Sequence, residues 1–236
     1  MHRLGFEQNE IKMLAEHLRN NNKIKVQSVF SHLIASDDKS RDEFTNKQAA
    51  IFLNCCEDLQ RVLSYNFIRH IVNTSAISRH PDLHMDMVRL GIGMYGIDGK
   101  ASMQKKLKNV STLITTIAQV KKVKAGENIG YGGNSILEKD SEIATVRIGY
   151  ADGYPRALSN GIGKMYVQYK LVPVVGNVCM DMTMLDVTGI NCKEGEKVIV
   201  FGEQLPIQQI AEWCNTISYE IMTGVSQRVK RIYFEE

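Results

Sequence analysis

The sequence predicts an α/β region followed by an all-β region, and three observations lead to this prediction. Segments typical of strands and helices alternate over residues 1–105, whereas residues 106–236 carry short strand-like segments separated by turns. Polar side chains follow the strand-like segments of the first region where those segments end. The 236 residues suffice for one large domain or two small ones. We therefore predict two domains with the bounds 1–105 and 106–236.

The composition excludes several classes of function. The apolar fraction of 44% and the charged fraction of 23% are ordinary for a globular protein. The net charge of +3 is small and its lysines are scattered, which does not favour a nucleic-acid partner. No apolar run reaches the roughly 18 residues of a membrane span, and no signal-peptide core follows Met1. We expect a cytoplasmic protein that has neither nucleic acid nor a membrane as its partner.

The cysteines do not form a disulfide or zinc pattern. They are odd in number, they include no Cys-x-x-Cys pair, and no histidine is spaced to complete a metal site. We therefore expect reduced thiols and no bound metal. The five cysteines are Cys55, Cys56, Cys179, Cys192 and Cys214.

Two segments of the first region have the periodicity of helices. In residues 7–18 and again in residues 41–63, apolar side chains recur every three to four positions. Gln48 interrupts the second pattern. The apolar positions of that second helix are Phe44, Ile51, Cys55, Leu59 and Val62.

Three segments of the first region, 25–33, 69–72 and 87–92, are typical of strands. Strands that alternate with helices pair in parallel, and functional groups gather at their carboxyl ends. Each polar residue there has a structural explanation when taken alone, as a core histidine, a turn or an ion pair. Their recurrence on successive units favours a shared site. These residues are His32, Asn73, Thr74 and Arg89.

The first region is too short for a closed barrel. An eightfold barrel needs about 200–250 residues, and only three or four strands are present here. A parallel sheet with an open edge exposes unpaired backbone groups. We therefore expect either a small open sheet or a chain that lacks its beginning.

The second region predicts an antiparallel barrel or sandwich. A helix over 206–214 and a final strand over 228–234 complete the expectation. The other expected strands are 112–120, 128–131, 143–150, 164–169, 171–178, 183–187 and 197–201.

Residues 143–156 are the most informative stretch, because a β-branched strand runs into a turn rich in Gly, Asp and Tyr. Taken alone, this turn could be an ordinary one. Two further inserts favour a functional site. They are the glycine-flanked tyrosine of 130–133 and the Asn-Val-Cys-Met-Asp-Met segment of 177–182.

Together these segments closely resemble alanine racemase, a family that interconverts L- and D-alanine with pyridoxal 5'-phosphate (PLP). The resemblance implies the C-terminal part of a TIM-type (β/α)8 barrel followed by a β-barrel or sandwich domain. It also implies a small amino-acid substrate, a role in peptidoglycan precursors, and a head-to-tail homodimer in which each site takes its tyrosine from the partner. The matching segments are 1–5, 31–32, 73–76, 87–96, 130–133, 149–156 and 179–181.

The resemblance assigns the site residues. Tyr131 resembles the catalytic acid/base, and Arg3 and Met180 resemble the residues that bind the substrate carboxylate. Tyr150 and Asp181 resemble residues of the entrance. Arg89 matches the arginine that faces the pyridine nitrogen, with His32 hydrogen-bonded beside it. The full set of cofactor-binding residues implied is His32, Asn73, Thr74, Arg89, Gly91, Ile92 and Tyr219.

The family also has a lysine that holds PLP covalently and is the second base. No lysine here lies in such a segment, so we expect the C-terminal portion of a racemase that is inactive alone. Two alternatives stay open. The chain could be a non-catalytic assembly module, or it could serve a racemase of another small amino acid such as serine.

Overall fold

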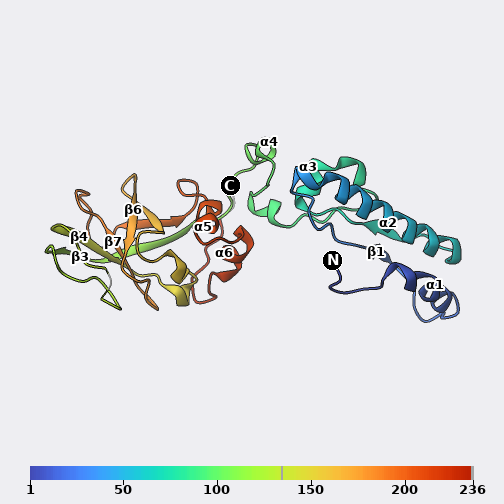
Figure 1. Ribbon diagram of the computed structural model, residues 1–236, viewed down its shortest axis with the longest axis horizontal. Coiled ribbons are helices and arrows are strands. Elements are labelled where there is room, and N and C mark those ends of the chain that lie inside the picture. Colours follow the sequence, from blue (N-terminus) through green and yellow to red (C-terminus); the bar gives the residue numbers. More distant parts are fainter. Residues whose placement is uncertain (134, 235–236) are drawn as a thin grey trace. The chain divides into compact units, whose positions relative to one another are not determined.

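The computed structural model describes residues 1–133 and 135–234. The chain divides into two compact units, Met1–Val110 and Ser111–Glu236 (Figure 1). Among the described residues, no helix combines the length and the apolar character needed to cross a membrane. All five cysteines are free, as expected.

The first unit has a two-stranded parallel sheet of β1 (Ser28–Phe30) and β2 (Ile68–His70), with Phe30 opposite His70. Both predicted helices are confirmed, and α1 and α2 contact each other. Their apolar side chains form one core with those around the strands. The helices of this unit are α1 (Ile11–Arg19), α2 (Asp42–Val62), α3 (Thr74–Arg79) and α4 (Ala101–Gln104). Four 3-10 helices, η1 (Gln8–Glu10), η2 (Lys39–Arg41), η3 (Pro81–Leu83) and η4 (Ile92–Tyr95), complete it.

The buried face of α2 agrees with the predicted one only in part: Leu59 is buried, and Cys55 and Val62 pack against the core, as the periodicity predicts. Phe44 and Ile51, which we expected in the core, are exposed by 41% and 39%. The apolar sequence of this helix has candidates at adjacent positions, so two neighbouring stripes have the same period. The side chains that α2 buries are Thr45, Ala49, Phe52, Cys56 and Leu59.

The predicted strand over 87–92 is wrong, although its backbone does lie beside β2. The Asp86 N–H donates to the Arg69 carbonyl at 3.2 Å, and the Arg89 N–H donates to the Val72 carbonyl at 3.0 Å. The chain then turns at Gly91 into η4 instead of extending the ladder. This turn carries the backbone over the start of α3.

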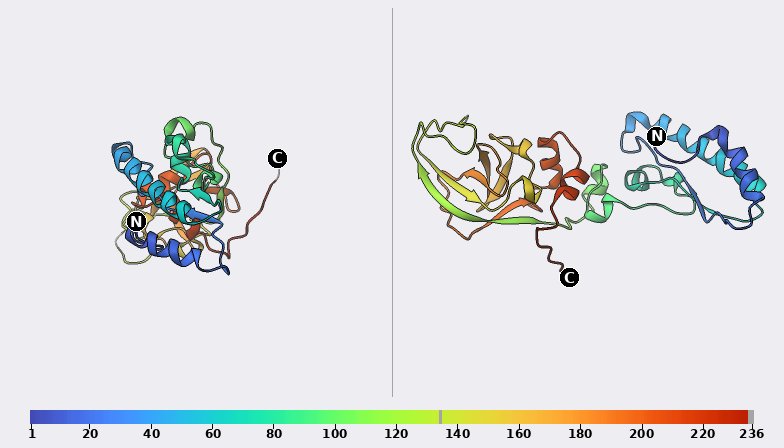
Figure 2. Two further views of the ribbon diagram at one scale, coloured as in Figure 1. Left: turned by 90° about the vertical axis from the view of Figure 1, so that its right-hand side faces the viewer. Right: turned by 90° about the horizontal axis from the view of Figure 1, so that it is seen from below.

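The second unit is a closed antiparallel barrel with the strand order β3-β4-β7-β6-β5-β8. Figure 2 shows α5 (Ile207–Trp213) and α6 (Ser218–Gly224) lying together at one end of the barrel. Two 3-10 helices, η5 (Tyr150–Asp152) and η6 (Arg156–Leu158), follow β4. The strands are β3 (Leu113–Val123), β4 (Ser141–Val146), β5 (Lys164–Val167), β6 (Lys170–Val175), β7 (Thr183–Asp186) and β8 (Lys197–Phe201).

Two predicted strands of this unit are wrong, and α6 was not predicted. Residues 128–131 make only an isolated bridge from Asn128 to Ile136, because the positive φ of Gly130 (72°) and Gly132 (90°) turns the chain out of extended geometry. Residues 228–234 are not in a strand. Since the barrel is closed, it has no free edge with which a further strand could pair.

Candidate functional site

Arg89 joins the carboxyl ends of β1 and β2. Its Nη2 donates to the carbonyl oxygen of Ser31 and, at 3.2 Å, to that of Ile71. Its guanidinium lies 5.2 Å from the centre of the Phe30 ring. The Nε atom of Arg89 is buried and has no hydrogen-bond partner among the residues that the structure describes. Arg89 is therefore held in place by strand ends and keeps one buried donor unused.

His32 and Arg3 lie near Arg89, and the two arginines lower the pKa values of their neighbours. Burial lowers the pKa of His32, and the charges of Arg89 and Arg3 lower it further. Burial and Arg3 also lower the pKa of Arg89. Among the described residues no hydrogen bond joins the side chains of His32 and Arg89, although the resemblance implies one; Nη2 of Arg89 donates to the two backbone carbonyls. Because its lowered pKa keeps His32 neutral, the positive potential here comes from Arg3 and Arg89, and it suits an anion.

Thr74 organises the glycine turn after residue 90. The Thr74 hydroxyl oxygen accepts from the Gly91 N–H at 2.9 Å and from the Gly93 N–H at 3.4 Å. A Cβ on Gly93 would lie 2.9 Å from Cγ2 of Thr74 and 2.7 Å from Cδ1 of Leu90, so any larger residue would force these side chains to shift. Ile92 begins η4 at this turn. Because the Thr74 oxygen accepts, the hydroxyl retains its own hydrogen for an acceptor.

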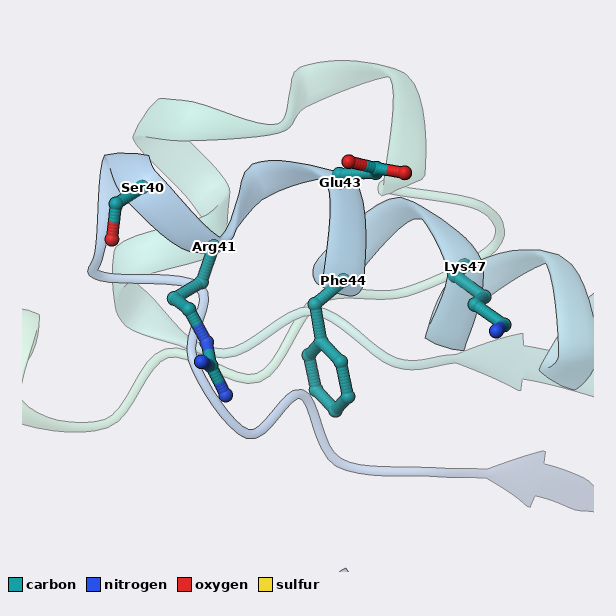
Figure 3. A pocket seen from close by; sticks show the side chains of 5 residues that line it. All are labelled: Ser40, Arg41, Glu43, Phe44 and Lys47. Atoms are coloured by element: carbon teal, nitrogen blue, oxygen red, sulfur yellow. The ribbon is translucent and has the colours of Figure 1, made fainter.

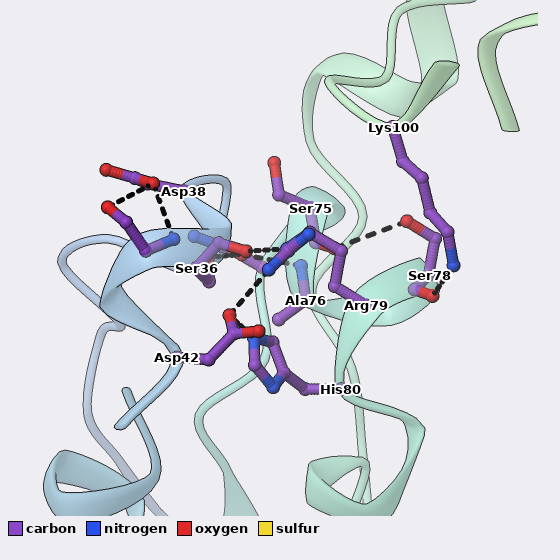
Figure 4. Close-up of polar contacts among 11 residues, drawn as sticks. Ser36, Asp38, Asp42, Ser75, Ala76, Ser78, Arg79, His80 and Lys100 are labelled. Carbon is purple, nitrogen blue, oxygen red and sulfur yellow. Dashed lines mark hydrogen bonds and ion pairs between the residues drawn. The ribbon is translucent and has the colours of Figure 1, made fainter. Parts of the chain in front are cut away.

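Asn73 ties the start of α3 to the loop after β1. Its Oδ1 caps α3 by accepting from the Ala76 N–H at 3.1 Å, and it also accepts from the Ser36 hydroxyl at 2.8 Å. Arg79 in turn donates through Nε to the Ser36 carbonyl at 2.9 Å and through Nη2 to Asp42 (Figure 4). The loop after β1 and the start of α3 therefore form one hydrogen-bonded group.

In the second unit, Tyr131 stands on a firmly held backbone with an exposed side chain. The side-chain amide of Asn177 donates to the Tyr131 carbonyl at 2.8 Å and accepts from the Asn160 amide at 3.2 Å. The residue as a whole is 74% exposed. The glycines on either side allow the turn, and the Asn177 contact fixes it to the segment after β6.

Tyr150 and Met180 are brought together by two closely packed loops. The Tyr150 N–H donates to the Cys179 carbonyl and the Ala151 N–H donates to the Met180 carbonyl, both at 3.0 Å. A Cβ on Gly149 would lie 2.2 Å from the Cys179 carbonyl oxygen, which explains the glycine. Both side chains remain exposed. Residues 149–151 and 179–180 thus form one surface.

Arg228 is a residue that sequence reasoning missed. Its Nε donates to Asp152 at 2.8 Å and its Nη2 donates to Asp181, and these carboxylates raise the pKa of Arg228. The Ser226 N–H also donates to the Asp152 carbonyl, at 3.0 Å. The sequence pattern predicts Arg228 in a strand, and no local pattern links it to carboxylates 47 and 76 positions away. Asp181 is thus held by the segment after α6.

A pocket lies elsewhere, at the start of α2, and none of the residues assigned by the resemblance lines it (Figure 3). The Arg41 guanidinium stacks 5.4 Å from the centre of the Phe44 ring on the same stretch. We do not assign a ligand to it. Its lining residues are Ser40, Arg41, Glu43, Phe44 and Lys47.

The site residues therefore fall into two groups. The first unit contains Arg3, His32, Asn73, Thr74, Arg89, Gly91 and Ile92, and the second contains Tyr131, Tyr150, Met180 and Asp181, with Tyr219 on α6. The first group fits PLP chemically. The unused Nε–H of Arg89 matches a pyridine nitrogen, which accepts a hydrogen bond. The Thr74 hydroxyl beside the glycine turn matches a phosphate oxygen.

The fold and these two groups of residues define the class: a partial α/β barrel with cationic strand ends, followed by an antiparallel β-barrel. Residues 1–99 match the family model "Alanine racemase, N-terminal domain", and residues 110–233 match "Alanine racemase, C-terminal domain". The chain therefore belongs to the alanine racemase family, and the predicted fold class is confirmed.

Relatives and solved structures agree with this assignment. An alanine racemase of Clostridium tetani is 39% identical over 221 residues, which are 90% of this chain and 57% of that relative. The crystal structure of alanine racemase from Bartonella henselae with covalently bound pyridoxal phosphate has a TM-score of 0.88 at 33% identity, and the match covers 99% of this chain and 64% of that one. The structure from Streptomyces lavendulae has a TM-score of 0.93 at 27% identity, covering 100% and 64%. The chain thus spans less than two thirds of these proteins.

Proposed function

We propose that this chain supplies the cofactor cradle and one acid/base of a PLP-dependent alanine racemase that provides D-alanine for peptidoglycan precursors. The observation that carries the proposal is Arg89, fixed by the carbonyls of Ser31 and Ile71 with its buried Nε–H unused. The proposal places the protein in the cytoplasm, where its five free cysteines stay reduced.

PLP supplies an electron sink that acidifies the α-hydrogen of a bound amino acid. With PLP bound, Arg89 would donate a hydrogen bond to the pyridine nitrogen and keep its own proton, because a guanidinium does not deprotonate in proteins. A ring held in this way would stay uncharged, which would disfavour return of the proton to the cofactor instead of the amino acid. Thr74 would donate to the phosphate at the turn of Gly91 and Ile92.

Racemisation requires one group that removes the α-proton and another that adds a proton to the opposite face. Tyr131 is the group on one face, and its exposed side chain is available to a second copy of the chain. The group on the other face is a lysine outside these 236 residues. Arg3 and the Met180 backbone N–H hold the substrate carboxylate. We propose a head-to-tail homodimer in which Tyr131 reaches the partner's cradle.

A chimera tests this function. The N-terminal part of the Clostridium tetani relative, which the match does not cover, is placed before this chain, and D-alanine formation from L-alanine is measured with and without PLP. We expect PLP-dependent activity, and we expect Tyr131→Phe to reduce kcat by about 10²–10⁴-fold. Serine as substrate measures the side-chain preference, and the unfused chain assayed in parallel should be inactive.

The matched control is Tyr169→Phe, because Tyr169 is a 90% exposed tyrosine between β5 and β6. It should leave kcat unchanged. A folded chimera that binds PLP and retains full activity with Tyr131→Phe would contradict the assignment of Tyr131. A folded, PLP-bound chimera without any racemase activity would contradict the proposed function.

A further inference from the structure

Gln48 is the polar residue that interrupts the apolar pattern of α2, and its side chain reaches the loop after β1. Its amide Nε2 donates to the His32 carbonyl at 2.6 Å, and its Oε1 accepts from the Ile34 N–H at 3.2 Å. The structure gives these two described backbone groups no other partner. One side chain therefore provides the hydrogen-bond partner of both these backbone groups.

This loop carries the carbonyl that holds Arg89. Ser31 comes directly before His32, and its carbonyl oxygen accepts from Nη2 of Arg89. On its other side, the Ser31 N–H donates to the His70 carbonyl at 3.3 Å, which fixes the loop to β2. Gln48 is the contact that fixes the following residues to α2. A continuous set of contacts thus runs from α2 through the loop to Arg89.

Only an amide can make both contacts from this position. Glutamate would keep an acceptor for the Ile34 N–H but has no donor for the His32 carbonyl, and methionine has neither. A backbone group that loses its partner must find water or move. Movement of the loop would displace the Ser31 carbonyl and release the guanidinium of Arg89.

We propose that Gln48 is a positioning residue, which holds the Ser31–Ile34 loop so that the Ser31 carbonyl fixes Arg89 with its Nε–H directed to the cofactor ring. The orientation toward a ring nitrogen rests on the proposed function. The hold on Arg89 itself is a property of this chain alone. Gln48 touches neither substrate nor cofactor and acts through the loop.

Gln60 is a matched control on the same helix. Its Nε2 donates to the Tyr65 carbonyl at 3.0 Å, so Gln60→Met also removes an amide-to-carbonyl hydrogen bond from α2. Both substitutions keep the helix propensity, because Gln and Met rank together. Only Gln48 contacts the loop that leads to Arg89.

The experiment is NMR of the full ¹⁵N-labelled chain carrying Gln48→Met or Gln60→Met. We expect Gln48→Met to speed amide exchange at Ile34 by about tenfold or more, to shift the Nε–H signal of Arg89, and to bring the pKa of His32 closer to its ordinary value. Gln60→Met should leave all three as in the original chain. Arg89 and His32 signals that Gln48→Met leaves unchanged would overturn the proposal, since a purely structural role would lower stability alone.

A second variant keeps the test decisive if Gln48→Met does not fold. Gln48→Glu retains the acceptor for Ile34 and loses the donor to His32, so Ile34 should stay protected while the Arg89 signal moves. An unmoved Arg89 signal in this variant overturns the proposal as well. These measurements need no cofactor, so an inactive chimera would refute the proposed function and leave them standing. In an active chimera, Gln48→Met should raise the ratio of transamination to racemisation and Gln60→Met should not.

Discussion

Arg89 shows how much a single side chain depends on backbone groups far away in the sequence. It lies 58 positions from Ser31 and 18 from Ile71, yet both carbonyls accept from the same Nη2. A lysine at this position could not do the same, because it lacks the planar guanidinium in which Nη2 makes these bonds while Nε offers a second donor. The strand ends therefore fix the position of the Nε–H of Arg89, and the need for a permanent positive charge explains why the residue is an arginine.

The charge of Arg89 should control which product forms. In the active chimera, Arg89→Glu is expected to raise the ratio of transamination to racemisation, because a carboxylate at the ring nitrogen favours a protonated ring and a deeper electron sink. The ratio is measured from pyruvate and D-alanine formed from L-alanine.

Arg61→Glu is the control for the Arg89 substitution. Arg61 lies on the exposed surface of α2, where it pairs with Asp58 at 2.8 Å. This change should leave the ratio as it was. An unchanged ratio in a folded, PLP-bound Arg89→Glu chimera would count against the role of Arg89.

Two histidines near Arg89 should make the first unit less stable in mild acid. Burial and Arg89 lower the pKa of His70, and burial, Arg89 and Arg3 lower that of His32, so both bind a proton less readily in the folded chain than in the unfolded chain. Above the unfolded value of 6.5, both states are neutral and the full stability is present. As the pH falls below 6.5, the unfolded chain takes up protons first, and stability is lost.

This expectation is measured by urea unfolding followed by circular dichroism at 222 nm. The midpoint should be lower at about pH 5.5 than at about pH 7.5, and His32→Gln should reduce the difference. The stability that the Asp86–Arg69 pair contributes is still present in this pH range and is lost only at lower pH, because hydrogen bonds from Arg69 lower the pKa of Asp86 from 3.8. Equal midpoints at the two pH values would contradict the expected sign.

At the scale of the element, the apolar pattern of α2 fits two neighbouring stripes on the helix surface. Phe44 and Ile51 have helical spacing with one another, and so do Thr45, Ala49 and Phe52 on the adjacent stripe. Contacts with α1 and with the strands bury the second stripe. The helix itself was predicted nearly to the residue, and Leu59 is buried as expected, but Phe44 and Ile51 are not.

A pair of substitutions tests the orientation of α2. Phe52→Ala should lower the free energy of unfolding of the first unit by about 3–5 kcal/mol, because Phe52 is 7% exposed and its removal leaves a cavity. Phe44→Ala should change it by no more than about 0.5 kcal/mol, because that ring lies at the surface. Urea unfolding measures both, and equal effects would place the wrong stripe in the core.

At the scale of the whole molecule, the two units differ in how the backbone groups of their strands find hydrogen-bond partners. The barrel closes on itself, so each of its strands has neighbours on both sides. Over its described residues, the first unit has only two paired strands, whose outer edges leave backbone groups without sheet partners. We therefore expect the first unit to unfold more easily than the barrel.

The single tryptophan makes this difference measurable. Trp213 ends α5 in the second unit and reports on that unit alone, whereas the long helix α2 makes the first unit prominent in the 222 nm signal. In urea, the 222 nm signal should begin to fall at a lower concentration than the tryptophan fluorescence changes. Coincident transitions would show that the two units unfold together.

The amino-acid pattern was sufficient for the fold class, for the helices α1, α2 and α5, and for the positions of six barrel strands. Periodicity and turn residues are local properties, which a window of ten to twenty residues already contains. The motifs were also sufficient for the family, since they recur in order along the chain.

Tertiary contacts decided the rest. Closure of the barrel excluded a strand over 228–234 and left Arg228 to bind Asp152 and Asp181. The carbonyls of Ser31 and Ile71 determined which donor of Arg89 stays unused, and packing determined which stripe of α2 is buried. Each of these outcomes depends on groups tens of residues apart in the sequence. The local sequence does not indicate which distant group will lie next to it in the folded chain.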